Sequence, residues 1–196
     1  MARHVQTKPR CPRCRLHSDR CICVSLPNLT PPIPVVMLQH WKEARKPTST
    51  GGLFTRLAEG CEQRVYGDRD RPFDTSGLDA PGSWLVFPPR EPPDPLPAEP
   101  PTQLVVVDGT WGQASRMVRR IPELARLPRL SFVAPARDVR RLRLPHSPEA
   151  RSTLEAVAAA FRVLGHTPFA DELECLHDHY VFETLRQRGI PRSQMP

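Results

Sequence analysis

The expected fold rests on the stretch Leu104-Val105-Val106-Val107-Asp108-Gly109-Thr110-Trp111. Its four consecutive apolar residues predict a strand that is covered on both faces, as strands of parallel sheets are. A helix is expected to follow over Gly112–Arg120, because apolar residues recur there at helical spacing, namely Ala114, Met117, Val118 and Ile121. The polar turn between strand and helix lies where α/β proteins bind their ligands, at the carboxyl end of a strand. Asp108–Trp111 is therefore the first candidate site.

Strands and helices alternate on both sides of this stretch. Short apolar runs predict further strands at Val35–Gln39, Trp84–Phe87 and Leu130–Val133. Helices are expected over Leu53–Gln63, from the capping-box sequence Ser152-Thr153-Leu154-Glu155 to about Gly165, and over Asp171–Arg188. The proline-rich segment Pro88–Pro101 is expected to be an extended loop, because proline is excluded from helix interiors. This alternation is typical of an α/β fold.

The composition favours a basic protein that binds nucleic acid. The 196 residues include 28 Lys and Arg against 21 Asp and Glu, a formal net charge of +7, and nearly all of the excess is arginine. The arginine guanidinium suits phosphates and bases. The alternative is a GC-rich genome, which raises the content of arginine and proline together, and the 25 prolines fit this alternative.

No apolar run is long enough to span a membrane, and the first residues lack the apolar segment of a secretory signal. We therefore expect a cytoplasmic protein.

A cysteine cluster near the amino terminus indicates a metal site. The spacing C-x2-C-x6-C-x-C brings together Cys11, Cys14, Cys21 and Cys23. Four thiolates suit tetrahedral zinc, and because they leave no open coordination position, the metal is expected to be structural. Redox-active cysteines and an iron–sulfur cluster are the alternatives. We expect residues 1–30 to form a small zinc-binding module and residues 31–196 to form the α/β domain.

Five segments occur in an order that resembles the DTW-domain family. They are the cysteine set, His40-Trp41-Lys42-Glu43, Phe87-Pro88, Asp108-Gly109-Thr110-Trp111, and Ser152-Thr153-Leu154-Glu155-Ala156. One stretch departs from the family pattern: Ser49-Thr50-Gly51 stands where members usually have Asn-Thr-Gly. The departure weakens any function assigned to residue 49.

The resemblance implies a fold and a reaction. The fold would be related to the SPOUT methyltransferases, with a mostly parallel sheet flanked by helices and a deep trefoil knot. The reaction would be transfer of the 3-amino-3-carboxypropyl group of S-adenosylmethionine to N3 of a uridine in tRNA, with release of methylthioadenosine. A monomer is expected, with a dimer as the alternative. Competing interpretations are an aminocarboxypropyltransferase acting on ribosomal RNA, an RNA methyltransferase of the same fold, and a zinc-bearing RNA-binding module without catalysis.

The resemblance also assigns functions to residues after three strands. The loops expected to hold S-adenosylmethionine contain Phe87 and Pro88; Asp108, Gly109, Thr110 and Trp111; and Ser152, Thr153 and Glu155. Asp108 would be the general base, or else the anchor of the ligand's amino group. Trp111 would line the binding site of the transferred aminocarboxypropyl group or stack on the target base. Helix capping explains Glu155 equally well. His40 and Glu43 are further candidates for the site, and a solvated loop is the alternative for both.

Arginines on either side of the candidate site are expected to bind RNA. They are Arg116, Arg119 and Arg120 on the helix after the Asp-Gly-Thr-Trp turn, and Arg137, Arg140, Arg141 and Arg143 beyond the next strand. Their contacts would be mainly to phosphate, which makes the affinity fall steeply with salt. Solvated surface is the alternative for several of them. Because a paired base is inaccessible to a buried donor, a loop nucleotide is the expected target.

Overall fold

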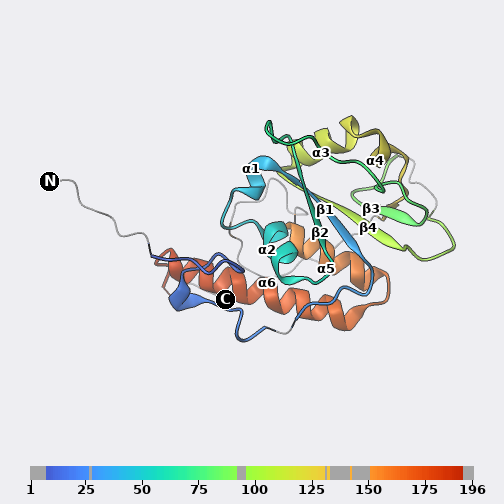
Figure 1. Ribbon diagram of the computed structural model, residues 1–196. Coiled ribbons are helices and arrows are strands. Elements are labelled where there is room, and N and C mark those ends of the chain that lie inside the picture. The colour runs from blue at the N-terminus through green and yellow to red at the C-terminus, as the bar shows by residue number, and fades with distance from the viewer. Residues whose placement is uncertain are drawn as a thin grey trace.

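Five parallel strands form one sheet in the part of the chain that the structure describes (Figure 1). The structure is a computed structural model that describes residues 8–26, 28–91, 96–130, 132, 142 and 151–191. The strands are β1 (Val35–His40), β2 (Glu62–Tyr66), β3 (Ser83–Val86), β4 (Gln103–Asp108) and β5 (Arg129–Leu130), in the order β2-β1-β4-β3-β5. The prediction of a parallel α/β fold is confirmed.

The register of the sheet brings the candidate site together. β4 lies in the middle of the sheet and pairs with β1 on one side and β3 on the other. Gln39 is the register partner of Asp108, so the carboxyl end of β1 lies next to the carboxyl end of β4. All strands are parallel, so the loops that follow them emerge at one edge of the sheet.

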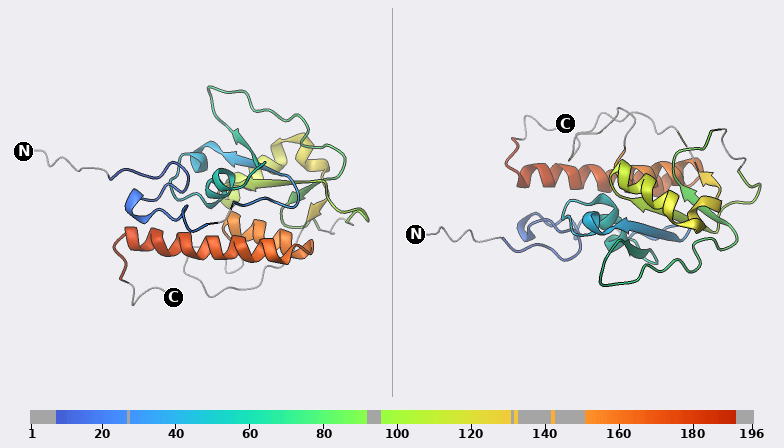
Figure 2. Two further views of the ribbon diagram at one scale, coloured as in Figure 1. Left: turned by 60° about the horizontal axis from the view of Figure 1, so that its bottom comes forward. Right: turned by 90° about the horizontal axis from the view of Figure 1, so that it is seen from above.

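Helices cover both faces of the sheet (Figure 2). They are α1 (Trp41–Ala44), α2 (Thr50–Leu57), α3 (Trp111–Arg120), α4 (Pro122–Arg126), α5 (Thr153–Val163) and α6 (Thr167–Gln187). Residues of α2, α5 and α6 share a hydrophobic cluster with Val35 and Met37, whereas those of α3 and α4 share one with Val36 and Leu38. Successive residues of β1 thus point to opposite faces, as the pleat requires.

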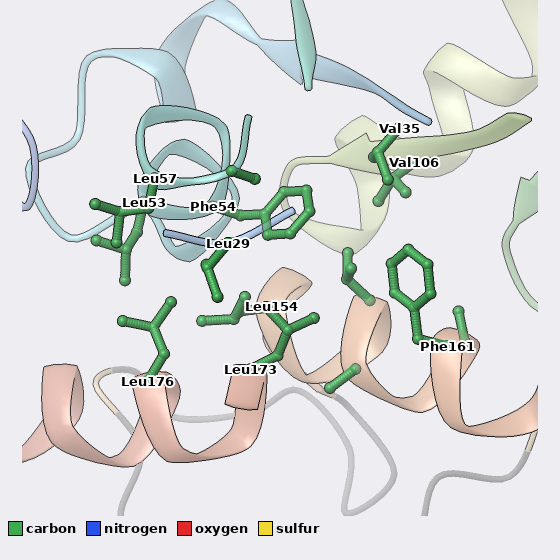
Figure 3. Packing of buried hydrophobic residues seen from close by; sticks show 14 of the residues in the cluster. Leu29, Val35, Leu53, Phe54, Leu57, Val106, Leu154, Phe161, Leu173 and Leu176 are labelled. Carbon is green, nitrogen blue, oxygen red and sulfur yellow. The ribbon is translucent and has the colours of Figure 1, made fainter. Parts of the chain in front are cut away.

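The larger cluster is built between α2, α5, α6 and the sheet. Figure 3 shows Phe54 and Leu53 of α2 facing Leu154 of α5 and Leu173 of α6. Phe161 packs edge-on against Phe169, with ring centroids 4.8 Å apart. Burial of these apolar side chains holds α5 and its amino-terminal turn against the sheet. That turn reaches the candidate site.

The cysteine segment packs against the end of α6. Cys14, Leu16 and Ile22 are buried in the same cluster as α2, α5 and α6. The backbone N–H of His17 donates to Gln187 Oε1 at 2.8 Å, and Arg20 forms an ion pair with Glu183 at 3.4 Å. The segment includes one short 3-10 helix, Ser18–Arg20.

Three predicted elements differ from the structure or extend beyond its described residues. The helix expected over Leu53–Gln63 is wrong beyond Leu57: the chain turns at Gly60, whose φ of +68° is left-handed, and Glu62 and Gln63 belong to β2. The last helix begins earlier than expected, at Thr167. Of the strand expected at Leu130–Val133, Leu130 is in β5, and Ser131 and Val133 lie outside the described residues.

None of the described helices combines the length and apolar character that a membrane crossing requires.

Candidate active site and metal centre

Asp108 is a buried carboxylate held by three side-chain donors. It is only 5% exposed at the end of the central strand β4. Its Oδ2 accepts from Gln39 Nε2 at 2.5 Å and from Ser49 Oγ at 3.1 Å. Its Oδ1 accepts from Thr153 Oγ1 at 2.5 Å. These donors come from β1, from the N-cap of α2 and from the first turn of α5, so the carboxylate exists in this environment only when all three elements are in place.

The donors are themselves fixed by further hydrogen bonds. Gln39 Oε1 accepts from Gln63 Nε2 of the edge strand β2. Ser49 Oγ accepts from Gly52 N at 2.9 Å, which caps α2, and from Gln39 Nε2 at 2.8 Å. With its two acceptor positions filled, the Ser49 hydroxyl directs its proton to Asp108. The network therefore has a defined direction that ends on the carboxylate.

Gly51 is needed for the close approach of α2. A Cβ atom at this position would lie 2.5 Å from Asp108 Oδ2 and 2.6 Å from its Cγ. Contacts this short do not occur between real Cβ atoms and carboxylates. The glycine after Thr50 therefore allows the amino-terminal turn of α2 to reach the carboxylate.

Burial raises the pKa of Asp108 above its ordinary value. Hydrogen bonds from Thr153, Gln39 and Ser49 act in the opposite direction, and the nearby negative charge of Glu43 adds to the rise. A carboxylate accepts at about four lone-pair positions, and the described residues fill three of them; the fourth can accept a ligand proton. Such a group can either take a proton from a nucleophile or hold an ammonium group.

An aromatic stack lies at the same edge. Trp111 and Phe87 are parallel within 2°, with ring centroids 5.5 Å apart, and the Arg129 guanidinium lies 5.4 Å from the Phe87 ring. Arg129 also donates to the carbonyl of the exposed Pro88. Trp111 remains 49% exposed, which is unusual for an indole and suits a surface on which a planar base stacks.

Both helices that begin at the site carry capping boxes. Thr110 caps α3 together with Gln113, whose Oε1 accepts from Thr110 N at 2.8 Å. Ser152 caps α5, and the Ser152 N–H donates to Glu155 Oε2 at 2.8 Å. The capping function expected of Glu155 is confirmed. Gly109 packs tightly against Gln113, since an added Cβ would lie 3.0 Å from the Gln113 Cβ.

His40 and Glu43 are structural parts of α1. His40 Nδ1 accepts from Lys42 N at 3.2 Å and caps the helix. Glu43 is 2% exposed and forms an ion pair with Lys46, so the alternative of a solvated loop does not hold for it.

The arginines expected to bind RNA are placed only in part. Arg116, Arg119 and Arg120 are exposed on α3, directly after the candidate site. Arg137, Arg140, Arg141 and Arg143 lie outside the described residues.

The four clustered cysteines converge on one point. Their Sγ atoms all lie within 4.8 Å of one another; Cys11 and Cys23 are 3.8 Å apart, and Cys14 and Cys21 are 3.9 Å apart. Zn–S bonds of about 2.3 Å place the sulfurs of a tetrahedral site about 3.8 Å apart. All four are free thiols. The cluster is therefore compatible with zinc.

The comparisons with known proteins agree with the order of motifs. A sequence model of the DTW domain matches residues 8–187, from the cysteine segment to the end of α6. The chain belongs to the DTW-domain family. The resemblance seen in the sequence is thereby confirmed, and the family match includes the cysteine segment as well as the sheet.

A curated relative is similar over most of the chain. The "tRNA-uridine aminocarboxypropyltransferase 2" of Drosophila melanogaster is 29% identical in an alignment of 175 residues that covers 81% of this chain and 68% of the relative. No solved structure matches the chain significantly.

Within this DTW domain, α2 connects the cysteine cluster with the buried carboxylate. Its N-cap, Ser49, donates to Asp108. Near its other end, Arg56 Nε donates to the carbonyl of Arg13, which lies between Cys11 and Cys14. Burial lowers the pKa of Arg56, while the neighbouring cysteines are among the groups that oppose this. A metal that orders the cysteine loop would therefore also support the helix that carries Ser49 and Gly51.

Sequence reasoning missed three residues of the site. Gln39 was assigned only to a strand, Gln63 to a helix, and Ser49 was set aside as a departure from the family pattern. Ser49 nevertheless caps α2 and donates to Asp108, which a serine hydroxyl can do as well as an asparagine amide. The amide in the otherwise apolar strand Val35–Gln39 was the one signal that pointed to Gln39.

Proposed function

We propose that this protein transfers the 3-amino-3-carboxypropyl group of S-adenosylmethionine to N3 of a uridine in tRNA. A bond forms between N3 and the γ-carbon of the methionine moiety, the bond between that carbon and sulfur breaks, and methylthioadenosine leaves with the electron pair. The N3 proton passes to a base. Since the sulfonium activates all three attached carbons, the choice of the transferred group depends on positioning.

One observation carries the proposal: a buried carboxylate and an exposed aromatic stack meet at the carboxyl edge of a DTW domain. The name of the Drosophila relative supports the reaction and the tRNA substrate. The α/β fold supports a small-molecule ligand at this edge, where parallel sheets bind their ligands.

Asp108 is assigned as the general base. Burial raises its pKa toward the range in which a carboxylate accepts protons efficiently, and three donors hold it in a single orientation. The alternative, an anchor for the donor's ammonium group, uses the same free lone pair.

The loops around Asp108 are assigned to the donor and the target base. Trp111 and Phe87 provide the stacking surface, with Pro88 beside it. Thr110, Gly109 and the first turns of α3 and α5, including Ser152 and Thr153, offer helix amino termini to the carboxylate of the donor. Glu155 contributes by holding the α5 turn.

Three further assignments belong to the same proposal. Cys11, Cys14, Cys21 and Cys23 would hold one structural zinc ion, which would stabilise a segment too short to fold alone. The SPOUT-like trefoil knot stays a prediction, because the chain between β5 and α5 lies almost wholly outside the described residues. We expect a cytoplasmic monomer whose partner is tRNA.

The test is to incubate the protein with unmodified tRNA and S-adenosylmethionine and to analyse nucleosides and small molecules by mass spectrometry. We expect aminocarboxypropyluridine and equimolar methylthioadenosine, both lost in Asp108→Asn. A methylated base with S-adenosylhomocysteine would identify a methyltransferase, and product on ribosomal RNA alone would reassign the substrate. Failure to bind S-adenosylmethionine would leave an RNA-binding module.

A further inference from the structure

A basic surface lies beside the candidate site, where the strand next to Asp108 ends and α1 begins. His40 follows Gln39, the register partner of Asp108, and begins α1. We call the group His40, Trp41, Lys42, Arg45 and Arg116 the α1 surface. Figures 1 and 2 show α1 near α3, the helix that carries Arg116. None of these residues was assigned to RNA binding from the sequence except Arg116.

Two cations of the α1 surface, Lys42 and Arg45, are held around one indole ring. Lys42 Nζ lies 5.4 Å and Arg45 Cζ lies 4.9 Å from the centre of the Trp41 ring. His40 stacks beside Trp41 at 6.1 Å, with an angle of 27° between the rings. Gly67, after β2, leaves room for the indole, since a Cβ there would lie 3.1 Å from Trp41 Cδ1. The ring thus orients two exposed cations that would otherwise be flexible.

The cations of this surface are not neutralised by ion pairs with other described residues. Within the described ranges, Lys42, Arg45 and Arg116 form no ion pair, and all three are exposed. The one carboxylate of α1, Glu43, is buried and pairs with Lys46. Burial lowers the pKa of His40, the charges of Lys42, Arg116 and Lys46 lower it further, and the charge of Glu43 opposes them.

We propose that the α1 surface binds the phosphate backbone of the substrate RNA next to the modified uridine. The inference rests on the proposed function, because it takes the RNA substrate from there. Phosphate fits the observations better than an acidic peptide does. The cations line the edge at which a base must be delivered to Asp108, and an RNA strand presents evenly spaced phosphates on both sides of that base. Lys42 and Arg45 would hold the strand on the β1 side, and Arg116 would hold it on the α3 side.

The experiment measures binding of unmodified tRNA to the full chain as a function of salt. The slope of log Kobs against log[salt] is negative, and each lost phosphate contact reduces its magnitude by about 0.7 to 0.9. We expect such a decrease for Lys42→Gln and for Arg45→Gln, and a decrease of about 2 to 3 for the triple variant that also carries Arg116→Gln. Trp41→Leu keeps the charges but loses their orientation, so we expect about 2- to 5-fold weaker binding, with partial recovery in Trp41→Phe.

Arg126→Gln is the matched control. Arg126 is 73% exposed and pairs with Asp79, which precedes β3, so this pair lies near the amino edge of the sheet. The substitution changes the net charge by the same amount and should leave the slope unchanged. Wild-type slopes in Lys42→Gln and Arg45→Gln, or an equal effect of Arg126→Gln, would overturn the proposal.

Equilibrium dialysis of S-adenosylmethionine separates this inference from the proposed function. We expect the α1 variants to bind the donor as the wild type does. A protein that binds the donor but no tRNA would overturn the α1 surface. A protein that fails to bind the donor, yet loses tRNA affinity in Arg45→Gln, would overturn the proposed reaction and keep the RNA surface.

Discussion

Replacement of Asp108 by asparagine should separate the fold of the site from its chemistry. The side chain keeps its shape, and its oxygen can still accept from Gln39 and Ser49. The new NH2 group then faces Thr153 Oγ1, whose hydroxyl can accept as well as donate. Asp108→Asn should therefore fold. Asp108→Ala leaves the buried donors without an acceptor, at a cost of about 1–3 kcal/mol for each that finds no other partner.

The expected effect on catalysis follows from the loss of proton transfer. A positioned general base contributes about 10²- to 10⁴-fold, equivalent to about 3–5 kcal/mol of activation free energy. We expect Asp108→Asn to lower kcat by that factor and to change the Kd of S-adenosylmethionine by less than about 3-fold. The measurements are single-turnover rates with tRNA and calorimetric titration of the donor. If the Kd instead rises by about 10- to 150-fold while kcat holds, the carboxylate is an anchor worth about 1.5–3 kcal/mol. Wild-type kinetics would refute both assignments.

The pH dependence gives a second readout of the same variant. Because the folded-state pKa of Asp108 is raised, the native state binds the proton more tightly than the unfolded state. The contribution of this group to stability is therefore present at low pH and is lost as pH rises from about 3.9 through the raised value. Asp108→Asn should remove that loss. Its stability relative to the wild type should therefore be greater at neutral pH than at pH 4. The wild-type rate should rise with pH through the same pKa, and residual activity of the variant should lack that limb.

Three other substitutions test the surroundings of the carboxylate. Gly51→Ala places a Cβ 2.5 Å from Asp108 Oδ2. We expect the free energy of unfolding to fall by about 1–3 kcal/mol and most of the activity to be lost. A fully active, equally stable variant would contradict the close packing. Cys14→Ser should lower the zinc content, measured by mass spectrometry, from one ion per chain and lower Tm, whereas unchanged content would remove this thiolate from the metal site. Trp111→Ala should raise the KM for tRNA at least about 5-fold, and Trp111→Phe, which keeps a ring against Phe87, should raise it less; equal values would show that stacking is not used.

Patterns within single segments were enough to predict most elements. The apolar run before Asp108 is β4, the capping box at Ser152 begins α5, and both follow from local physical chemistry. The same reasoning failed at Leu53–Gln63, because a left-handed glycine and a polar edge strand leave no periodic signal. Edge strands have one neighbour and one exposed side, so their burial pattern is weak.

The amino-acid sequence by itself determined the strand before Asp108, the helix caps, the clustered thiolates and the family, because each depends on residues that are near one another in the chain or on their order. Only the tertiary structure decided the environment of Asp108. Gln39, Ser49 and Thr153 lie 69, 59 and 45 residues away, and they meet at one carboxylate through the parallel register of β1 with β4 and the packing of α2 and α5. Direct contact between residues so far apart is set by the balance of burial and hydrogen bonding over the whole domain, which no single segment encodes.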